Sequence, residues 1–405
     1  MTHLPRTPDN RNQAQREGNL TVEKVTLSVI KANVGGFVGN ADTHEDILEK
    51  ARESLSKAAS KGLLVDSWTA RCGDDLALMM THEKGVENKE IHKLAWETFT
   101  ACAEVAEKLH LYNPAQDLFS ESFNGTLRGL GPGVAELAFR ERPCESFIIF
   151  LADKCELGAW NLPLYKMFAD PFNTAGLVID PSMHEGFAFE ILDIVENKTL
   201  TLQCPGDLYD LIMFLGSRGR FVVNKVIRRV DGMVAAFTSC PRPVGMGAKA
   251  GTDDPALIVR CQNGLPTVGE ATEAFAFPHM VSGWMRATYQ GPMMPVAFKD
   301  ARAFRYDGPP RVTAAGFQLA NGEFIGPVDL FDDPAFDSVR RKATEVVEYL
   351  RRHGPFEPHR VPHEQMANTP FPPLIARLED RMVRVGDEDK KRKKKQTASA
   401  TEDGE

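Results

Sequence analysis

Apolar and polar residues alternate with two different periods along the chain, and the changes between them predict alternating strands and helices. The β-branched, apolar run Val25–Ala32 predicts a strand, and the closely spaced glycines after it predict a loop. A helix is predicted from Thr43 to its close at Gly62, with acidic residues in its first turn. Its apolar stripe is Ile47, Ala51, Leu55 and Ala58.

Two more strands and a second helix complete the first hundred residues. The strands are predicted over Leu63–Arg71 and Leu76–Thr81, joined through Gly73-Asp74-Asp75, and the helix over Glu90–Leu109. The resulting order of strand, helix, strand, strand and helix is most of a split βαβ, ferredoxin-like unit.

The same elements recur after a glycine-rich middle region around Gly125–Gly133, which predicts loops. The predicted strands are Ser146–Ala152, Phe187–Val195, Thr199–Gln203, Phe221–Arg228, Met233–Thr238, Ala256–Gln262 and a hairpin over Phe317–Ile325 that turns at Asn321-Gly322. The predicted helices are Leu208–Leu215, Glu270–Phe277 and Asp337–Arg352. Because strands and helices recur in both halves, we expect an α/β fold, a layered α-β-β-α sandwich with two stacked sheets between outer helices.

Length and composition predict one large domain with two tails. The chain has 405 residues, of which 42% are apolar, so residues 23–385 can bury a core as a single domain. Residues 1–22 are polar and lack an apolar signal core, so a disordered extension is expected. Residues 386–405 form a charged tail containing Lys390–Lys395, predicted to be solvated and disordered, with contact to phosphate polymers or membranes as the alternative.

Charge and cysteine usage narrow the partners and the compartment. The net charge of −8 argues against general nucleic-acid binding, and no run approaches 18 apolar residues, so no membrane span is expected. The seven cysteines are odd in number and lack CxxC spacing, which predicts buried free thiols in a reducing cytoplasm. Cys155 lies beside Asp153-Lys154, but a buried thiol is favoured over a catalytic one.

Three short acidic motifs adjoin strand-like runs: Gly73-Asp74-Asp75, Ala152-Asp153-Lys154 and Gly251-Thr252-Asp253-Asp254. Mg²⁺ prefers carboxylate oxygens, with water or substrate phosphate completing its octahedron. A single Asp-Asp pair is more often a solvated turn. Three motifs brought together predict a multi-metal phosphate site that activates water and neutralises a leaving group.

Long stretches around these motifs resemble the archaeal and bacterial fructose-1,6-bisphosphate aldolase/phosphatase family. The resemblance runs from about Val25 to about Leu378. It is carried by SVIKANVGG, GDDLALMMTH, AQDLFSESFNGTLRGLGPGVAE, ADKCELGAWNLPLYKMFADPFNTAGLVIDPSMH, CQNGLPTVGEATEAFAFPHMVSGWMR and GPVDLFDDPAFD.

The resemblance implies a gluconeogenic enzyme that binds several Mg²⁺ ions and assembles as a homo-octamer. Family enzymes join two triose phosphates through a lysine Schiff base and then hydrolyse the C1 phosphate of fructose 1,6-bisphosphate. The positions matching the family's metal ligands are Asn33, Asp74, Asp75, Gln116, Asp153, Asp253 and Asp254. The positions matching its substrate contacts are Asn40, Tyr112, Gly125, Lys154, Gln262, Arg286 and Asp307.

The chain departs from the family at five of its functional positions. Asn33 replaces a metal-binding Asp, and Asn40 replaces a substrate-binding His. Thr252 stands where the Schiff-base lysine is expected and cannot form an imine. Lys249 and Asn368 occupy the positions of two tyrosines.

The resulting hypothesis is a Mg²⁺-dependent fructose-1,6-bisphosphate phosphatase whose aldolase step is lost or altered. Asp74 or Asp75 would activate the attacking water, and loss of Asp254 should abolish turnover. The alternatives are a bifunctional enzyme that uses Lys249 as the nucleophile, a non-catalytic relative that binds sugar bisphosphates, and a phosphatase with another phosphorylated substrate.

Overall fold

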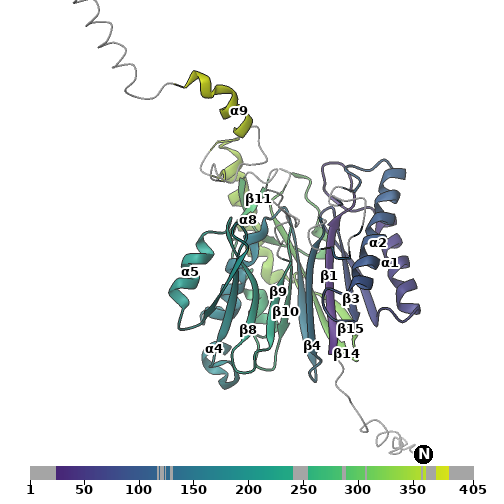
Figure 1. Cartoon of the computed structure of the whole chain (residues 1–405). Coiled ribbons are helices and arrows are strands. Elements are labelled where there is room, and N and C mark those ends of the chain that lie inside the picture. Colours follow the sequence, from purple (N-terminus) through teal and green to yellow (C-terminus); the bar gives the residue numbers. More distant parts are fainter. Residues whose placement is uncertain are drawn as a thin grey trace, which may run out of the picture.

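The structure, a computed structural model, has two β-sheets stacked between outer layers of helices (Figure 1). This arrangement confirms the predicted layered α-β-β-α sandwich. The structure describes residues 24–115, 118, 123, 125–127, 131–239, 254–284, 289–305, 308–356, 359–361 and 371–382. Both predicted tails, and the proposed domain ends at residues 23 and 385, lie outside these residues.

The smaller sheet has four strands in the order β2-β3-β1-β4, with helices α1 and α2 on its outer face. Its elements are β1 (Lys24–Asn33), α1 (Glu45–Ser60), β2 (Asp66–Cys72), β3 (Asp75–His82), α2 (Lys89–Lys108) and β4 (Gly133–Arg140). Strand β4 was not predicted, and it completes the ferredoxin-like unit by pairing antiparallel to β1. Its short sequence GVAELAFR begins with glycine, so the partner strand rather than local propensity decides its conformation.

Helix α1 begins at Glu45, two residues after the predicted start. The reason is that His44 is the cap: its Nδ1 accepts a hydrogen bond from the Asp46 amide at 3.2 Å. Similarly, α6 begins at Val268, earlier than predicted, because Thr267 and Glu270 form a capping box there. It ends at Glu273, before the predicted Phe277.

The larger sheet has nine strands, with β13-β14-β5-β10-β9-β8-β6-β7 as its main path and β15 paired to β14. Its strands are β5 (Glu145–Asp153), β6 (Phe187–Asp193), β7 (Lys198–Gln203), β8 (Phe221–Arg228), β9 (Val234–Thr238), β10 (Ala256–Cys261), β13 (Met294–Pro295), β14 (Arg311–Ala320) and β15 (Glu323–Asp329). The β14–β15 turn contains Asn321-Gly322, as predicted. A separate two-stranded sheet joins β11 (Met280–Gly283) to β12 (Tyr289–Pro292).

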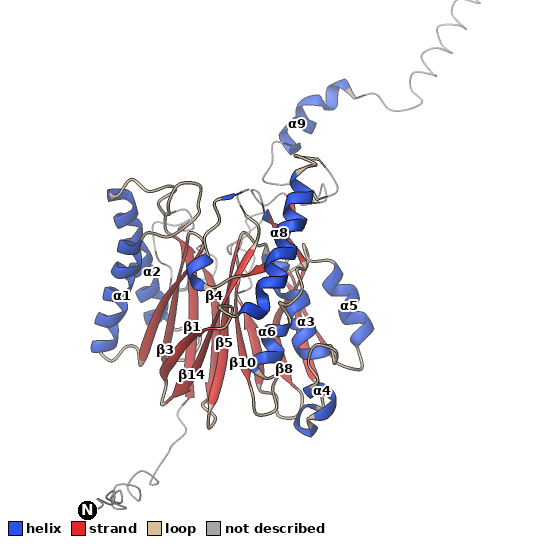
Figure 2. Cartoon of the chain, turned by 180° about the vertical axis from the view of Figure 1, so that it is seen from behind, coloured by secondary structure: helices blue, strands red, loops and turns tan. Residues whose placement is uncertain are grey.

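Helices cover the outer face of the larger sheet (Figure 2). They include α3 (Asn161–Ala169), α4 (Gly176–Ile179), α5 (Leu208–Gly216), α6 and α8 (Asp337–Arg351), and a further helix, α9, spans Phe371–Leu378. Within the described residues, no helix is long and apolar enough to cross a membrane.

The core lies in three layers because the central strands are buried on both faces. In β5, Phe147, Ile149 and Leu151 pack between the two sheets. The alternate residues of the same strand, including Ile148 and Phe150, pack under the outer helices. The sheets are therefore held face to face, and the polar residues at their shared edge are brought close together.

The cysteines described by the structure are all free, and all but the exposed Cys144 are buried. Burial raises the pKa of the Cys155 thiol well above its usual value, with Asp254 and Asp153 adding to the effect. Cys155 therefore lacks the thiolate character of a catalytic cysteine. Cys240 lies outside the described residues.

Candidate active site

The acidic motifs converge because four strand ends meet at one edge of the stacked sheets. In the small sheet, Asn33 at the end of β1 pairs with Asp75 at the start of β3. In the large sheet, Asp153 at the end of β5 pairs with Arg311 at the start of β14. Residues Asp75, Ala77 and Met79 alternate along β3, and the latter two pack in the layer between the sheets, so Asp75 points toward the large sheet.

Gly73 makes the close approach of the two sheets possible. It has φ +61°, and a Cβ added there would lie 2.2 Å from Asp153 Oδ1. Its amide donates to the Ala301 carbonyl at 2.9 Å. A residue without a side chain is therefore required at this turn, because the Asp153 carboxylate fills the space.

Lys154 joins the acidic residues of the two sheets. Its Nζ donates to Asp153 Oδ1 at 3.0 Å, to Asp74 Oδ1 at 3.1 Å and to the Asn40 carbonyl at 2.9 Å. Burial alone would lower the pKa of Lys154, but the nearby carboxylates, Asp153 foremost, outweigh burial and raise it well above the usual value. Lys154 therefore carries a fixed positive charge at the centre of the site.

Lys31 is a second cation of the site, is fully buried, and was not among the site residues predicted from the sequence. Its ammonium contacts Asp75 Oδ2 at 2.5 Å and donates to the carbonyls of Ala152 at 2.6 Å and Asp254 at 2.7 Å. Burial opposes the charge, but Asp75 and then Asp254 raise the pKa of Lys31 above its usual value. The available signal was a lysine within an otherwise apolar strand, a position that usually demands a buried partner.

Asp254 is fixed between the two lysines by the backbone. The Cys155 amide donates to Asp254 Oδ1 at 2.5 Å, and the Asp254 amide donates to the Cys155 carbonyl at 2.5 Å. Its φ is +69°, a left-handed conformation that is uncommon for residues other than glycine. The segment before β10 thus holds this carboxylate beside Lys154 and Asp153.

Three of the carboxylates are harder to ionise than usual. Burial raises the pKa of Asp74 to about 6, partly offset by Lys154 and reinforced by Asp75. Burial also raises the pKa of Asp75 and Asp254, against the opposing effect of Lys31. Asp153 Oδ2 is buried and has no hydrogen-bond partner within the described part of the chain. Such a cluster of like charges favours a cation.

The donor chemistry fits a hard divalent cation, because every acidic group of the cluster offers carboxylate oxygens. Among the described residues, no three carboxylate, imidazole or thiol groups form a set that could hold a metal ion. Lys154 and Lys31 instead contact three of the carboxylates directly. Gln116 and Asp253, the remaining predicted ligands, lie outside the described residues.

Asn33, which matches a metal ligand of the family, forms hydrogen bonds within the protein at both ends of its side-chain amide. Its Nδ2 donates to Asp74 Oδ2, and its Oδ1 accepts from the Gly35 amide at 3.0 Å. The amide therefore stabilises the Asp74 carboxylate by a hydrogen bond and supports the glycine turn. Asn40 turns its main-chain carbonyl to Lys154, while its buried Oδ1 has no partner among the described residues.

The other predicted substrate positions are less tightly grouped. Tyr112 is half exposed and forms a two-way backbone bridge with Gly36, which packs against Asp74. Gly125 has φ +103° and lies beside the Lys89 side chain. Gln262 follows β10 at the end of the strand opposite Asp254. At the rise of a β-strand, the two residues lie roughly 25 Å apart, so Gln262 does not reach the cluster of its own chain. Arg286, Asp307, Lys249, Thr252 and Asn368 lie outside the described residues.

Known proteins resemble the chain over almost its full described length. The family described as fructose-1,6-bisphosphatase matches residues 24–383. A fructose-1,6-bisphosphate aldolase/phosphatase of Methanothermobacter marburgensis is 52% identical over 359 residues, covering 88% of this chain and 98% of the relative. The Moorella thermoacetica protein of the same name is 52% identical, covering 91% of this chain and 96% of its own length.

Both the extent of these matches and the gathered carboxylates agree with the family suggested by the sequence motifs. The chain belongs to the fructose-1,6-bisphosphatase family.

Proposed function

We propose that the protein hydrolyses the C1 phosphate of fructose 1,6-bisphosphate in a Mg²⁺-dependent reaction. The observation that carries this proposal is the meeting of Asp74, Asp75, Asp153 and Asp254 with Lys154 at one sheet edge. Half of the aligned residues are shared with relatives named for the same substrate, which supports the choice of sugar bisphosphate.

Mg²⁺ would be held by the oxygen donors of the cluster together with those of Gln116 and Asp253. When bound, it polarises a phosphoryl oxygen and makes a coordinated water more acidic. Lys154 supplies a positive charge for the substrate phosphate, and the matching position of Arg286 adds a guanidinium that can bind phosphate through two hydrogen bonds.

Asp74 or Asp75 would accept the proton of the attacking water. Because burial raises the pKa of Asp74 to about 6, this carboxylate is mostly ionised at neutral pH yet is a stronger base than an exposed aspartate. Asp75 is held by Lys31 and can act in the same way only while that ion pair keeps it in place. Lys154 orients Asp74 and limits its rotation.

Phosphate release from fructose 1,6-bisphosphate, measured with and without Mg²⁺, tests the proposal. We expect release only with the metal. Bisphosphate binding by calorimetry without release under any divalent metal would support the non-catalytic alternative. Absence of both binding and release would point to another phosphorylated substrate.

Replacement of Asp254 by Ala tests the site. We expect the rate of phosphate release to fall below detection, because Asp254 lies among the cluster carboxylates and lysines. Asp231→Ala is the matched control, since Asp231 pairs with Arg228 away from the cluster. Full activity in Asp254→Ala would refute the site assignment.

Aldolase activity is a second candidate because the similar proteins carry both activities in their names. Thr252 cannot form the imine, so a Schiff base would need Lys249 with a lowered pKa. Borohydride treatment with dihydroxyacetone phosphate, followed by mass spectrometry, would find an adduct on Lys249 if the candidate is correct. Absence of an adduct would leave phosphatase activity as the only candidate function.

A further inference from the structure

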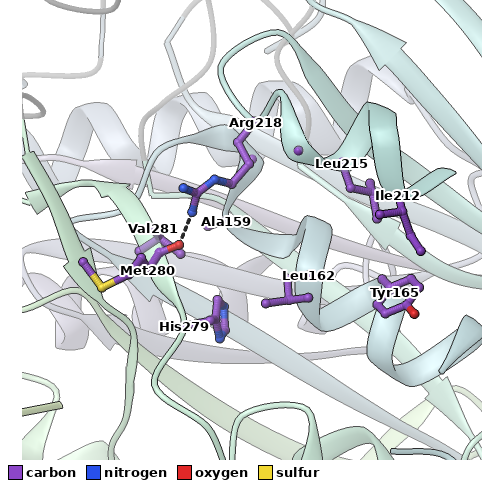
Figure 3. A pocket seen from close by; sticks show the side chains of 11 residues that line it. Ala159, Leu162, Tyr165, Ile212, Leu215, Arg218, His279, Met280 and Val281 are labelled. Carbon is purple, nitrogen blue, oxygen red and sulfur yellow. Dashed lines mark hydrogen bonds between the residues drawn. The ribbon is translucent and has the colours of Figure 1, made fainter. Parts of the chain in front are cut away.

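A pocket distinct from the acidic cluster lies between α3, α5 and β11. Its volume is about 360 Å³, at the lower end of the range of small-molecule sites. Figure 3 shows Arg218, His279 and Met280 on one side and Tyr165, Ile212 and Leu215 on the other. None of its lining residues belongs to the acidic cluster.

Most of the pocket wall is apolar. The side chains of Leu162 and Tyr165 come from α3, those of Ile212 and Leu215 from α5, and that of Val281 from β11. Such walls suit a hydrocarbon or aromatic body. A phosphorylated sugar would place its hydroxyl groups against these apolar surfaces and lose their hydration, so the pocket is chemically unlike the proposed active site.

Arg218 is the cation of this pocket, and among the described residues it forms no direct ion pair. Its Nη1 donates to the Met280 carbonyl, which carries no full charge. In the described part of the chain, no carboxylate lies within ion-pair distance of its guanidinium. Burial lowers the pKa of Arg218, against the more distant Glu156. A partly buried guanidinium that Glu156 compensates only from beyond ion-pair distance is costly, so an incoming anion would be stabilised here.

His279 provides a neutral polar group in the same wall. The residue is 6% exposed, and its Nε2 has no hydrogen-bond partner among the described residues. Burial lowers the pKa of His279 to about 4, so the imidazole is uncharged at neutral pH. It therefore offers one hydrogen bond to a ligand and leaves Arg218 as the source of charge.

We propose that this pocket binds a small carboxylate with an apolar body. The guanidinium of Arg218 would pair with the carboxylate, and the α3 and α5 side chains would cover the hydrocarbon. A carboxylate matches the planar guanidinium through two parallel hydrogen bonds. This proposal does not depend on the phosphatase function.

Calorimetric titration of the intact protein with octanoate tests the proposal, with octan-1-ol as the uncharged ligand of similar shape. We expect saturable binding of octanoate and binding of octanol at least about tenfold weaker. Arg218→Met should weaken octanoate binding by a similar factor. Arg220→Met is the matched control, because Arg220 is exposed and pairs with Asp193 outside the pocket.

Gly216→Trp provides an independent test that leaves Arg218 in place. Gly216 lines the pocket rim and is exposed, and a Cβ added there would meet no atom within 4 Å, so an indole can be placed at the pocket without a clash at Cβ. We expect this variant to lose octanoate binding while retaining its thermal stability. Equal octanoate affinity in wild type, Arg218→Met and Gly216→Trp would overturn the proposal. The proposal would also be overturned if wild type bound no octanoate and the variants changed in oligomeric mass. That result would indicate that the pocket is a contact between subunits.

Discussion

A buried lysine, Lys31, and a half-buried one, Lys154, explain how four carboxylates can share one edge of the sheets. Lys31 contacts Asp75, and Lys154 contacts Asp74 and Asp153, so each lysine offsets part of the repulsion that burial strengthens. All three protons of the Lys31 ammonium have partners in the structure. Replacing Lys31 would thus leave both a buried carboxylate and two carbonyls without their donor.

Asn33→Asp should make the protein more dependent on a divalent cation. The change replaces the amide that donates to Asp74 with a second carboxylate, so two negative groups would face each other. We expect unfolding stability in EDTA to fall by about 1–3 kcal/mol, and the stabilisation by Mg²⁺ to exceed that of wild type. Chemical denaturation with EDTA or Mg²⁺ measures both effects.

Asn224→Asp is the matched control for this variant. Asn224 Nδ2 also donates to a carboxylate, that of Glu190, at 2.6 Å, but far from the cluster on β8. Its destabilisation should not be reversed by Mg²⁺. Equal Mg²⁺ responses in the two variants would contradict the placement of a metal beside Asp74.

Among the elements, the β2–β3 turn has the strictest geometric requirement. Gly73→Ala combines an unfavourable positive φ with a Cβ that would overlap the Asp153 carboxylate. We expect a loss of several kcal/mol in unfolding stability and a large loss of phosphate release, since Asp153 must move. Gly62→Ala has a similar φ of +73° but open space around its Cβ, so it should cost only about 1 kcal/mol. Equal losses of unfolding stability in the two variants would show that backbone strain, and not overlap with Asp153, decides the effect at Gly73.

Strand β4 is tied to its neighbours by a buried polar network around Glu136. Its carboxylate accepts from Ser28 Oγ at 2.8 Å and from the Glu87 amide at 2.8 Å, and it lies 3.2 Å from His92 Nε2. His82 joins the network through a 2.9 Å contact with Ser28 Oγ. Polar contacts therefore help to hold β1, β3, β4 and α2 in register.

The network predicts a loss of stability in acid. Burial lowers the pKa of His82 to about 4, below its value of 6.5 in an unfolded chain. Between these two pKa values the folded state binds fewer protons than the unfolded chain. The contribution of neutral His82 to the free energy of unfolding is therefore complete above pH 6.5 and is lost as the pH falls toward 4. The contribution is about 3 kcal/mol at most. His82→Gln should flatten the stability curve between pH 6.5 and 4, whereas replacement of the exposed His184 by Gln should not.

At the scale of the whole molecule, we propose assembly as a homo-octamer. Phe172, Val178 and Ile179 are 100%, 62% and 76% exposed, and they lie close together in sequence at α4. Exposed apolar groups of this kind favour burial against another subunit. The resemblance to the family suggests that the partner is a second copy of the chain.

The double variant Phe172→Asp, Ile179→Asp should reduce the molecular mass in light scattering without changing the circular dichroism spectrum. Val195→Asp, in the turn between β6 and β7, is the control and should retain the mass of wild type. A monomeric wild-type protein, or an unchanged mass in the double variant, would exclude this surface as a subunit contact.

The local pattern of apolar and polar residues was sufficient to predict most helices and strands, but not all of them. The apolar run of β1 and the stripe of α1 were recognisable because each side chain repeats with the period of its own element. Strand β4 was missed because its conformation depends on pairing with β1, about 100 residues earlier. Helix ends shifted by a few residues because caps such as His44 decide them.

The acidic residues of the cluster were identifiable from their motifs, because Asp74-Asp75, Asp153 and Asp254 are carboxylates next to strand-like runs within short stretches of chain. Their arrangement was not. The order of strands decides that Asp254 meets Asp153 and Lys154, that Lys31 reaches across to the second sheet, and that Gln262 lies at the opposite end of β10. Residue type and period are local properties, whereas these contacts join segments far apart in sequence and exist only when both sheets pack together.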